Sequence, residues 1–69
     1  MEEVRIDTEY IKLDQFLKLI NICQSGGEAK FIIKSGNVKV NNELVYERGK
    51  KIRKGDKVSI EGDNIYIVV

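Results

Sequence analysis

The spacing of the apolar residues changes at Gly36, and this change decides the fold class. Before Gly36, apolar residues recur at i, i+3, i+4 and i+7, which is the period of an amphipathic helix. They form two sets, one within residues 11–22 and one after Ser25: Leu13, Phe16, Leu17 and Ile20; Ala29, Ile32 and Ile33. After Gly36, Val38 and Val40 alternate with Lys39, which is the period of a strand. We therefore expect two helices, the second ending at Gly36, followed by a sheet.

Turn-forming residues divide the remainder of the chain into short strands. Asn41 and Asn42 tolerate positive φ and predict a tight hairpin between residues 38–40 and the apolar pair 44–45. A second hairpin is predicted at 61–64, between a strand at 57–60 and the apolar C-terminal run, and residues 53–56 form a turn before it. A short strand at 3–6 adds to the sheet edge. The predicted fold class is α+β, with two antiparallel helices packed on a small, mostly antiparallel sheet.

The length of the chain limits its organisation. With 69 residues it forms a single domain, 1–69, because a chain this short has no room for a second core. Its 42% apolar and 33% charged residues are typical of a compact soluble protein. No apolar run reaches the roughly 18 residues of a membrane span, and the acidic N-terminus is unlike a signal peptide. We expect a cytoplasmic monomer without a membrane partner.

The cysteine and histidine content argues against catalysis and metal binding. Cys23 is the only cysteine and there is no histidine, so the usual zinc-ligand sets are excluded. Cys23 lies in an apolar run, which favours a buried thiol, and a thiol-dependent enzyme would need a base beside it. We expect no enzyme, no metal, no cofactor and no small-molecule substrate.

The net charge of +1 conceals a strong asymmetry along the chain. Residues 1–29 hold three bases and six acids, a net charge of −3, whereas residues 30–57 hold nine bases and three acids, a net charge of +6. Residues 58–69 hold two acids and no base. The densest basic run covers residues 48–57, and such a run is typical of nucleic-acid binding, although a solvated loop can also carry it.

Two glycines occupy the first places of the second helix, where they are poor helix formers. Ser25 and Glu28 form a capping box, in which the serine accepts from the Glu28 N–H and the carboxylate accepts from the Ser25 N–H. Gly26 and Gly27 then have two explanations: close packing or a turn that only glycine allows, or bare N–H groups that form a phosphate site. Lys30, one turn on, could face the same anion.

These residues together resemble a known family. The markers are Leu13-Asp14 with Phe16-Leu17, then Ser25, Ala29, Ile33 and Gly36, the strand 38–41, and "KGDKV" at 54–58. They are similar to the RNA-binding domain named after small-subunit ribosomal protein four, the alpha-L motif, over residues 11–60. The glycine pair and the basic run are similar to its small stand-alone bacterial members, the YaaA/YbcJ-like group. The resemblance implies two helices on a bent sheet, without catalytic activity.

The same resemblance implies an RNA-binding face made by the helix pair and the adjoining strands and loop. Carried over by position, and completed by the basic run, the candidate RNA-binding residues are Lys12, Ser25, Gly26, Gly27, Lys30, Lys39, Asn41, Arg48, Lys50, Lys51 and Arg53. The aromatic residues are scattered, and only Tyr46 lies near enough to the basic run to stack on a base. Shape and phosphate recognition are therefore favoured over base reading.

The sequence thus predicts a non-catalytic RNA-binding module for structured RNA, such as ribosomal RNA or its precursors. The alternative is a protein-interaction adaptor, in which the basic loop docks an acidic partner.

Overall fold

The computed structural model describes residues 1–69 as two helices and seven strands. The helices are α1 (Leu13–Leu19) and α2 (Gly26–Lys34). The strands are β1 (Glu2–Val4), β2 (Ile11–Lys12), β3 (Val38–Val40), β4 (Glu43–Leu44), β5 (Lys51–Ile52), β6 (Lys57–Ile60) and β7 (Ile65–Val68). The α+β fold class is confirmed.

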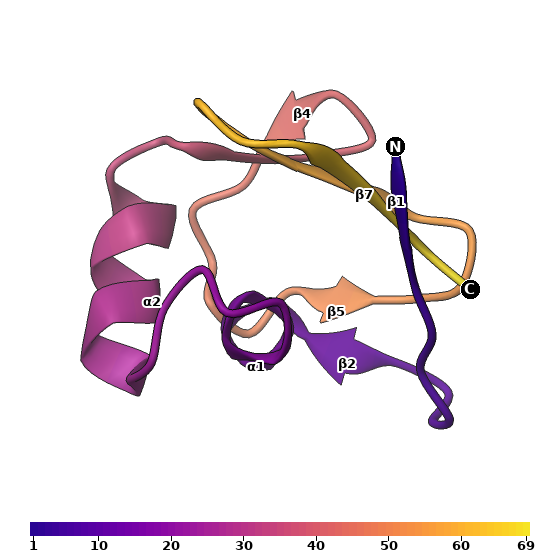
Figure 1. Ribbon diagram of the computed structural model, residues 1–69. Coiled ribbons are helices and arrows are strands. Elements are labelled where there is room, and N and C mark those ends of the chain that lie inside the picture. The colour runs from indigo at the N-terminus through magenta and orange to yellow at the C-terminus, as the bar shows by residue number, and fades with distance from the viewer.

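Five strands form one sheet in the order β1-β7-β6-β3-β4. Neighbouring strands are antiparallel except β1 and β7, which are parallel, and β1 lies at the edge as predicted. The remaining strands, β2 and β5, pair separately in an antiparallel ribbon. Figure 1 shows both helices and this ribbon on the same side of the five-stranded sheet. The other face of the sheet is left uncovered.

The core lies between the helices and the sheet. It is made by the apolar residues at helical spacing in the two helices and by the alternate apolar residues of the strands. Fully buried side chains on α1 and α2 face alternate residues of the strands. The buried set includes Leu13, Phe16, Leu17, Ala29, Ile33, Val38, Val40, Val58, Ile60, Tyr66 and Val68. Within it, the Phe16 and Tyr66 rings pack edge to face, with centroids 6.4 Å apart.

The predicted turn residues adopt the conformations that their sequence requires. Asn41 and Asn42 have φ of 52° and 71° and connect β3 to β4, as expected for a tight hairpin. Gly36 has φ of 77° directly after α2, where a residue with a β-carbon would be strained. Both predictions are confirmed.

Two details differ from the expectation. Ile11 and Lys12 do not belong to the first helix but form β2, because Ile11 pairs with Ile52, a fully buried residue within the presumed basic loop. The helices also do not run antiparallel: Figure 1 views α1 along its axis and α2 from the side, so the two helices cross. Neither helix has the length and apolar character needed to cross a membrane.

Candidate nucleic-acid interface

The first turn of α1 is capped by the backbone of the basic loop rather than by its own N-cap residue. Lys12 occupies the N-cap position and its side chain makes no capping bond. Instead, the Leu13 N–H donates to the Lys50 carbonyl at 2.8 Å and the Asp14 N–H to the Arg48 carbonyl at 3.0 Å. These bonds satisfy N–H groups that a helix leaves without partners. The loop backbone is therefore held against the start of α1.

The β2–β5 pairing places two lysines directly opposite each other. Lys12 and Lys51 are register partners, and opposite residues of an antiparallel pair project from the same face. Like charges in this position destabilise the pair, and neither lysine forms a salt bridge. The Lys51 ammonium lies 4.9 Å from the centroid of the Tyr10 ring, a cation–π contact that leaves its charge unneutralised.

Five exposed cations thus surround the start of α1. We call them the α1 cation cluster: Lys12, Arg48, Lys50, Lys51 and Arg53. The Arg53 guanidinium also lies over the Tyr10 ring, 5.6 Å from its centroid. Arg53 forms the one salt bridge of the chain, 3.6 Å from Glu9. The cluster brings five of the eleven predicted RNA-binding residues together, and its charge is nearly unopposed.

The second group of predicted residues lies at the start of α2. Ser25 is its N-cap, and its hydroxyl accepts from the Glu28 N–H at 3.2 Å, as predicted. The Glu28 carboxylate does not return to the Ser25 N–H. It accepts from the Gln24 N–H at 3.3 Å, one residue earlier, while Ser25 has the extended conformation usual for an N-cap, with φ −139° and ψ 159°.

The glycine pair does not have a packing explanation. A β-carbon on Gly26 would meet nothing within 4 Å, and one on Gly27 would meet only the Ser25 Oγ at 3.9 Å. Neither glycine has positive φ. Close packing and a glycine-only turn are both absent, so the space over the first turn of α2 is open. Lys30 follows one turn later and is exposed.

Asn41 is used inside the protein. Its Nδ2 donates to Asp56 Oδ1 at 3.0 Å, and its Oδ1 accepts from the Lys57 N–H at 3.0 Å. The other Asp56 oxygen accepts from the Arg53 N–H at 2.8 Å. These bonds join the β3–β4 turn to the turn before β6, and they leave few polar groups of Asn41 free.

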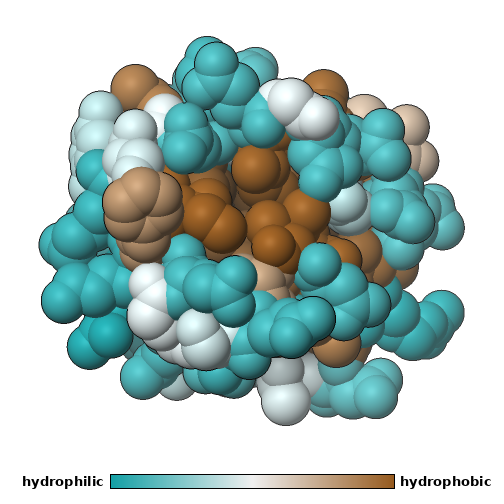
Figure 2. All heavy atoms as spheres, turned by 60° about the vertical axis from the view of Figure 1, so that its left-hand side comes forward, coloured by the Kyte–Doolittle hydropathy of each residue, from teal (hydrophilic) through white to brown (hydrophobic).

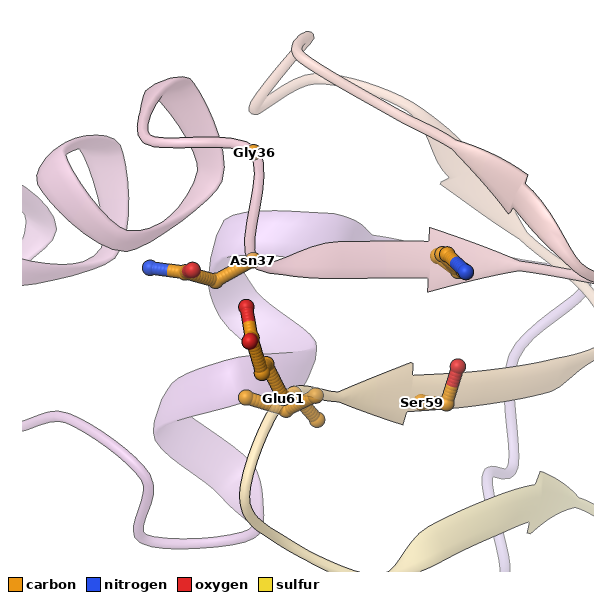
Figure 3. Close-up of a pocket in the computed structure, with 6 residues that line it drawn as sticks. Gly36, Asn37, Ser59 and Glu61 are labelled. Carbon is orange, nitrogen blue, oxygen red and sulfur yellow. The ribbon is translucent and has the colours of Figure 1, made fainter.

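Lys39 lies apart from the helices. Val38 and Val40 on either side of it are buried toward α1 and α2, so the alternation of β3 places Lys39 on the uncovered face of the sheet, beside Ser59 of β6. It therefore does not lie on one face with Lys30, as the predicted single RNA-binding face required. Figure 3 shows the shallow pocket next to it, where Asn37 and Glu61 meet at the ends of β3 and β6.

A different face of the molecule is hollowed and apolar. Figure 2 shows hydrophobic residues gathered in a depression with a hydrophilic margin. One pocket of the protein is lined by Ile22, Ile32 and Ile60 together with the polar residues Asn37, Glu61 and Asp63. No residue of the predicted RNA-binding set lines it.

Two aromatic side chains, Tyr46 and Phe31, are exposed to solvent. Tyr46, the predicted base-stacker, is half-exposed, and its ring lies over Gly36, 3.5 Å from the position of a β-carbon there. Phe31 on α2 is 73% exposed, more than any other large hydrophobic residue. Sequence reasoning did not single it out. The signal was its position, because the helical period places Phe31 on the side of α2 opposite the apolar stripe.

Cys23 is buried, as predicted. Desolvation by burial, with a smaller contribution from Glu28, raises the pKa of its thiol. The reactive thiolate form is therefore disfavoured at neutral pH.

The sequence and the fold are both similar to those of known proteins. The profile of the S4 domain matches residues 4–68 of this chain. The chain is 48% identical over 66 residues to the probable ribosome maturation protein RlbA of Bacillus subtilis (strain 168), an alignment covering 96% of this chain and 93% of that protein. Its fold is similar to the crystal structure of the 30S ribosomal protein S4e from Thermoplasma acidophilum, with a TM-score of 0.67 and 27% identity. That similarity covers 91% of this chain and 33% of the ribosomal protein, so the chain spans about one third of its length.

Proposed function

This chain belongs to the S4 domain family, and from that premise we propose that it is a non-catalytic module that binds structured RNA through the α1 cation cluster. The RNA is ribosomal RNA or its precursors. Two relatives support this assignment, since one is a probable ribosome maturation protein and the other a protein of the 30S ribosomal subunit.

The observation that carries the proposal is the Lys12–Lys51 pair. Two lysines face each other across β2 and β5, and no acid lies within salt-bridge distance of either. Such a pair lowers the stability of the free protein. An anion that binds between the two ammonium groups removes this repulsion, and a phosphate of an RNA backbone has the required charge.

The geometry of the loop strengthens the argument. Because the Arg48 and Lys50 carbonyls are bonded to the start of α1, the backbone that carries these cations is fixed before any ligand arrives. A preordered surface loses less entropy on binding than a flexible loop does. A fixed set of cations without a deep cleft suits the phosphates that border the wide minor groove of an RNA helix.

The direct test reverses the charge of Lys50 and Lys51. Both side chains are exposed, and a glutamate at 51 would face Lys12, so the double variant K50E/K51E should fold with nearly the stability of the parent. Its affinity for a structured RNA hairpin should fall at least about tenfold at moderate salt, or about 1.4 kcal/mol. Fluorescence anisotropy measures the affinity and circular dichroism the fold.

Lys57→Glu is the matched control, because Lys57 is exposed on the uncovered face of the sheet, away from the α1 cation cluster. The same titrations at several salt concentrations should give a slope of about −4 in log K against log salt, if four or five phosphates are contacted. Equal losses for K57E and K50E/K51E, or a slope near zero, would contradict the proposal. Tighter binding to polyglutamate than to RNA would indicate an adaptor for acidic proteins instead.

A further inference from the structure

One stripe of α2 remains unexplained by the fold. Residues 27, 30, 31 and 34 follow each other at helical spacing and line a shallow hollow of about 320 Å³ together with Ser35. The Ser35 hydroxyl donates to the Phe31 carbonyl at 2.7 Å and closes the C-terminal end of the hollow. The stripe lies on the solvent side of the helix, and Phe31 within it is opposite the buried positions Ala29 and Ile33.

Phe31 is the centre of this stripe. With 73% of its surface exposed, it contributes nothing to the core, and the buried positions of α2 are filled without it. A single exposed apolar residue is common on protein surfaces and needs no explanation by itself. The surroundings of Phe31 are less common, because its neighbours along the stripe are two lysines and a glycine.

Gly27 lies one turn before Phe31 and lines the same hollow. Side chains of a helix lean toward its N-terminus, so the side chain at position 31 leans toward position 27, while a β-carbon at 27 would still lie more than 4 Å from the ring. Any longer side chain at 27 would cover part of the ring, and glycine leaves it open. Since the protein itself needs no glycine at this place, the open ring gives a reason for the residue that packing does not.

Lys30 and Lys34 give the stripe its charge. Neither forms a salt bridge. Glu28, the only acid of α2, directs its carboxylate to the Gln24 N–H at 3.3 Å and the Ser25 hydroxyl at 3.5 Å, so it is engaged in the helix cap. Lys30 and Lys34 are one turn apart and lie along the same side of Phe31. An aromatic ring with two unopposed cations along one side matches the composition of a nucleotide chain, a flat base attached to a phosphate backbone.

We propose that this face of α2 binds one unpaired RNA base, stacked on Phe31, with the neighbouring phosphates against Lys30 and Lys34. The inference rests on the proposed function and extends it, because it names a single-stranded segment next to the RNA helix as part of the ligand. A protein partner is the less suitable occupant, since the hollow contains one hydrophobic residue and an aliphatic anchor would find no other apolar contact there.

The test compares two RNA hairpins, one blunt and one with a single-stranded 3′ tail that contains 2-aminopurine, a base whose fluorescence is quenched by stacking. The parent protein should quench the tail and bind the tailed hairpin about tenfold more tightly than the blunt one. Phe31→Leu keeps an apolar side chain but removes the ring, so both effects should be lost. Phe31→Tyr should restore them. Binding of the blunt hairpin should be the same for all three proteins.

Gly27→Leu is a second, independent variant. Leucine is a better helix former than glycine, so the variant should fold at least as well as the parent, while its side chain covers the ring. It should lose the tail effect as Phe31→Leu does. If both variants keep the quenching and the tenfold preference, the base site is wrong.

The two proposals fail in different ways. Parent protein that binds the blunt hairpin but gains nothing from the tail would overturn the base site alone. Parent protein that binds neither hairpin would overturn both. A Phe31→Leu variant with unchanged RNA binding but lost association with another protein would assign Phe31 to a protein contact.

Discussion

Two polar regions of this small protein use similar residues in opposite ways. Around Asn41 and Asp56, three side-chain hydrogen bonds between 2.8 and 3.0 Å join two turns, and the polar groups satisfy one another. In the α1 cation cluster, only Arg53 has an acidic partner, and Lys12 faces Lys51. The first region contributes to the stability of the fold, whereas the second leaves charge available to a ligand.

The difference divides one predicted set into residues whose side chains bond within the domain and residues whose side chains do not. Asn41 and Ser25 were both expected to contact RNA, yet their side chains bond to the backbone of the same domain. Lys12, Lys50 and Lys51 have no such bonds. We therefore expect changes in the first group to alter unfolding and changes in the second to alter RNA affinity.

The largest effect is expected for Asn41→Ala. The variant loses two hydrogen bonds and places alanine at a φ of 52°, which is unfavourable for a residue with a β-carbon. The free energy of unfolding should fall by about 2–3 kcal/mol, with about 1 kcal/mol for each bond and about 1 for the backbone. Urea titration followed by circular dichroism measures it.

Asn41→Gly is the matched control, because glycine accepts the positive φ and loses only the bonds. Its loss should be smaller than that of alanine. At temperatures where both variants are folded, their RNA affinity should equal that of the parent. If the folded glycine variant bound RNA about tenfold more weakly than the parent, Asn41 would belong to the RNA interface.

A smaller effect of opposite sign is expected for Lys12→Glu. A glutamate here faces Lys51 and lies at the N-terminus of α1, and both positions favour an acid. The free energy of unfolding should rise by about 0.5–1 kcal/mol, while RNA affinity should fall severalfold. Thermal unfolding and anisotropy on the same sample separate the two effects.

Lys12→Gln serves as the neutral reference for this comparison. It removes the repulsion without adding an attractive charge, so it should lie between the parent and Lys12→Glu in both measurements. A Lys12→Glu variant that is less stable than the parent would show that the two lysines do not repel each other in solution.

The smallest effect is expected for Glu9→Gln. Its bond to Arg53 is 3.6 Å long, and the two side chains are 86% and 51% exposed, so removing the charge should change the free energy of unfolding by less than about 0.5 kcal/mol. RNA binding should strengthen slightly, because the variant removes a negative charge close to Arg53 of the α1 cation cluster. Weaker binding would mean that Glu9 positions Arg53 for its contact.

Much of the fold was predictable because the signals are local. The i, i+3, i+4 spacing of Leu13, Phe16 and Leu17 gave the core face of α1, and Ser25 gave the start of α2. Gly36 and Asn41–Asn42 adopt the positive φ that these residue types tolerate. Each prediction depends on residues within one turn or one hairpin.

The site was less predictable, because its geometry depends on long-range pairing. Nothing local shows that Ile52, inside a run of lysines and arginines, is fully buried and pairs with Ile11. Without that pairing, Ile11 and Lys12 look like the first residues of a helix. The alternation that turns Lys39 away from the helices also became clear only with the position of the sheet.

The sequence by itself determined both helices, the alternating strand after Gly36 with its hairpin, the single buried core and the excess of positive charge between residues 30 and 57. Only the tertiary structure decided where that charge acts. It brings the Arg48 and Lys50 carbonyls to the first N–H groups of α1, which have no partner within the helix, and it sets Lys12 opposite Lys51. It also engages the Asn41 side chain in hydrogen bonds within the domain. The physical reason is that helix period and turn conformation follow from neighbouring residues, whereas unpaired backbone groups and side chains find partners far along the chain only when the core forms.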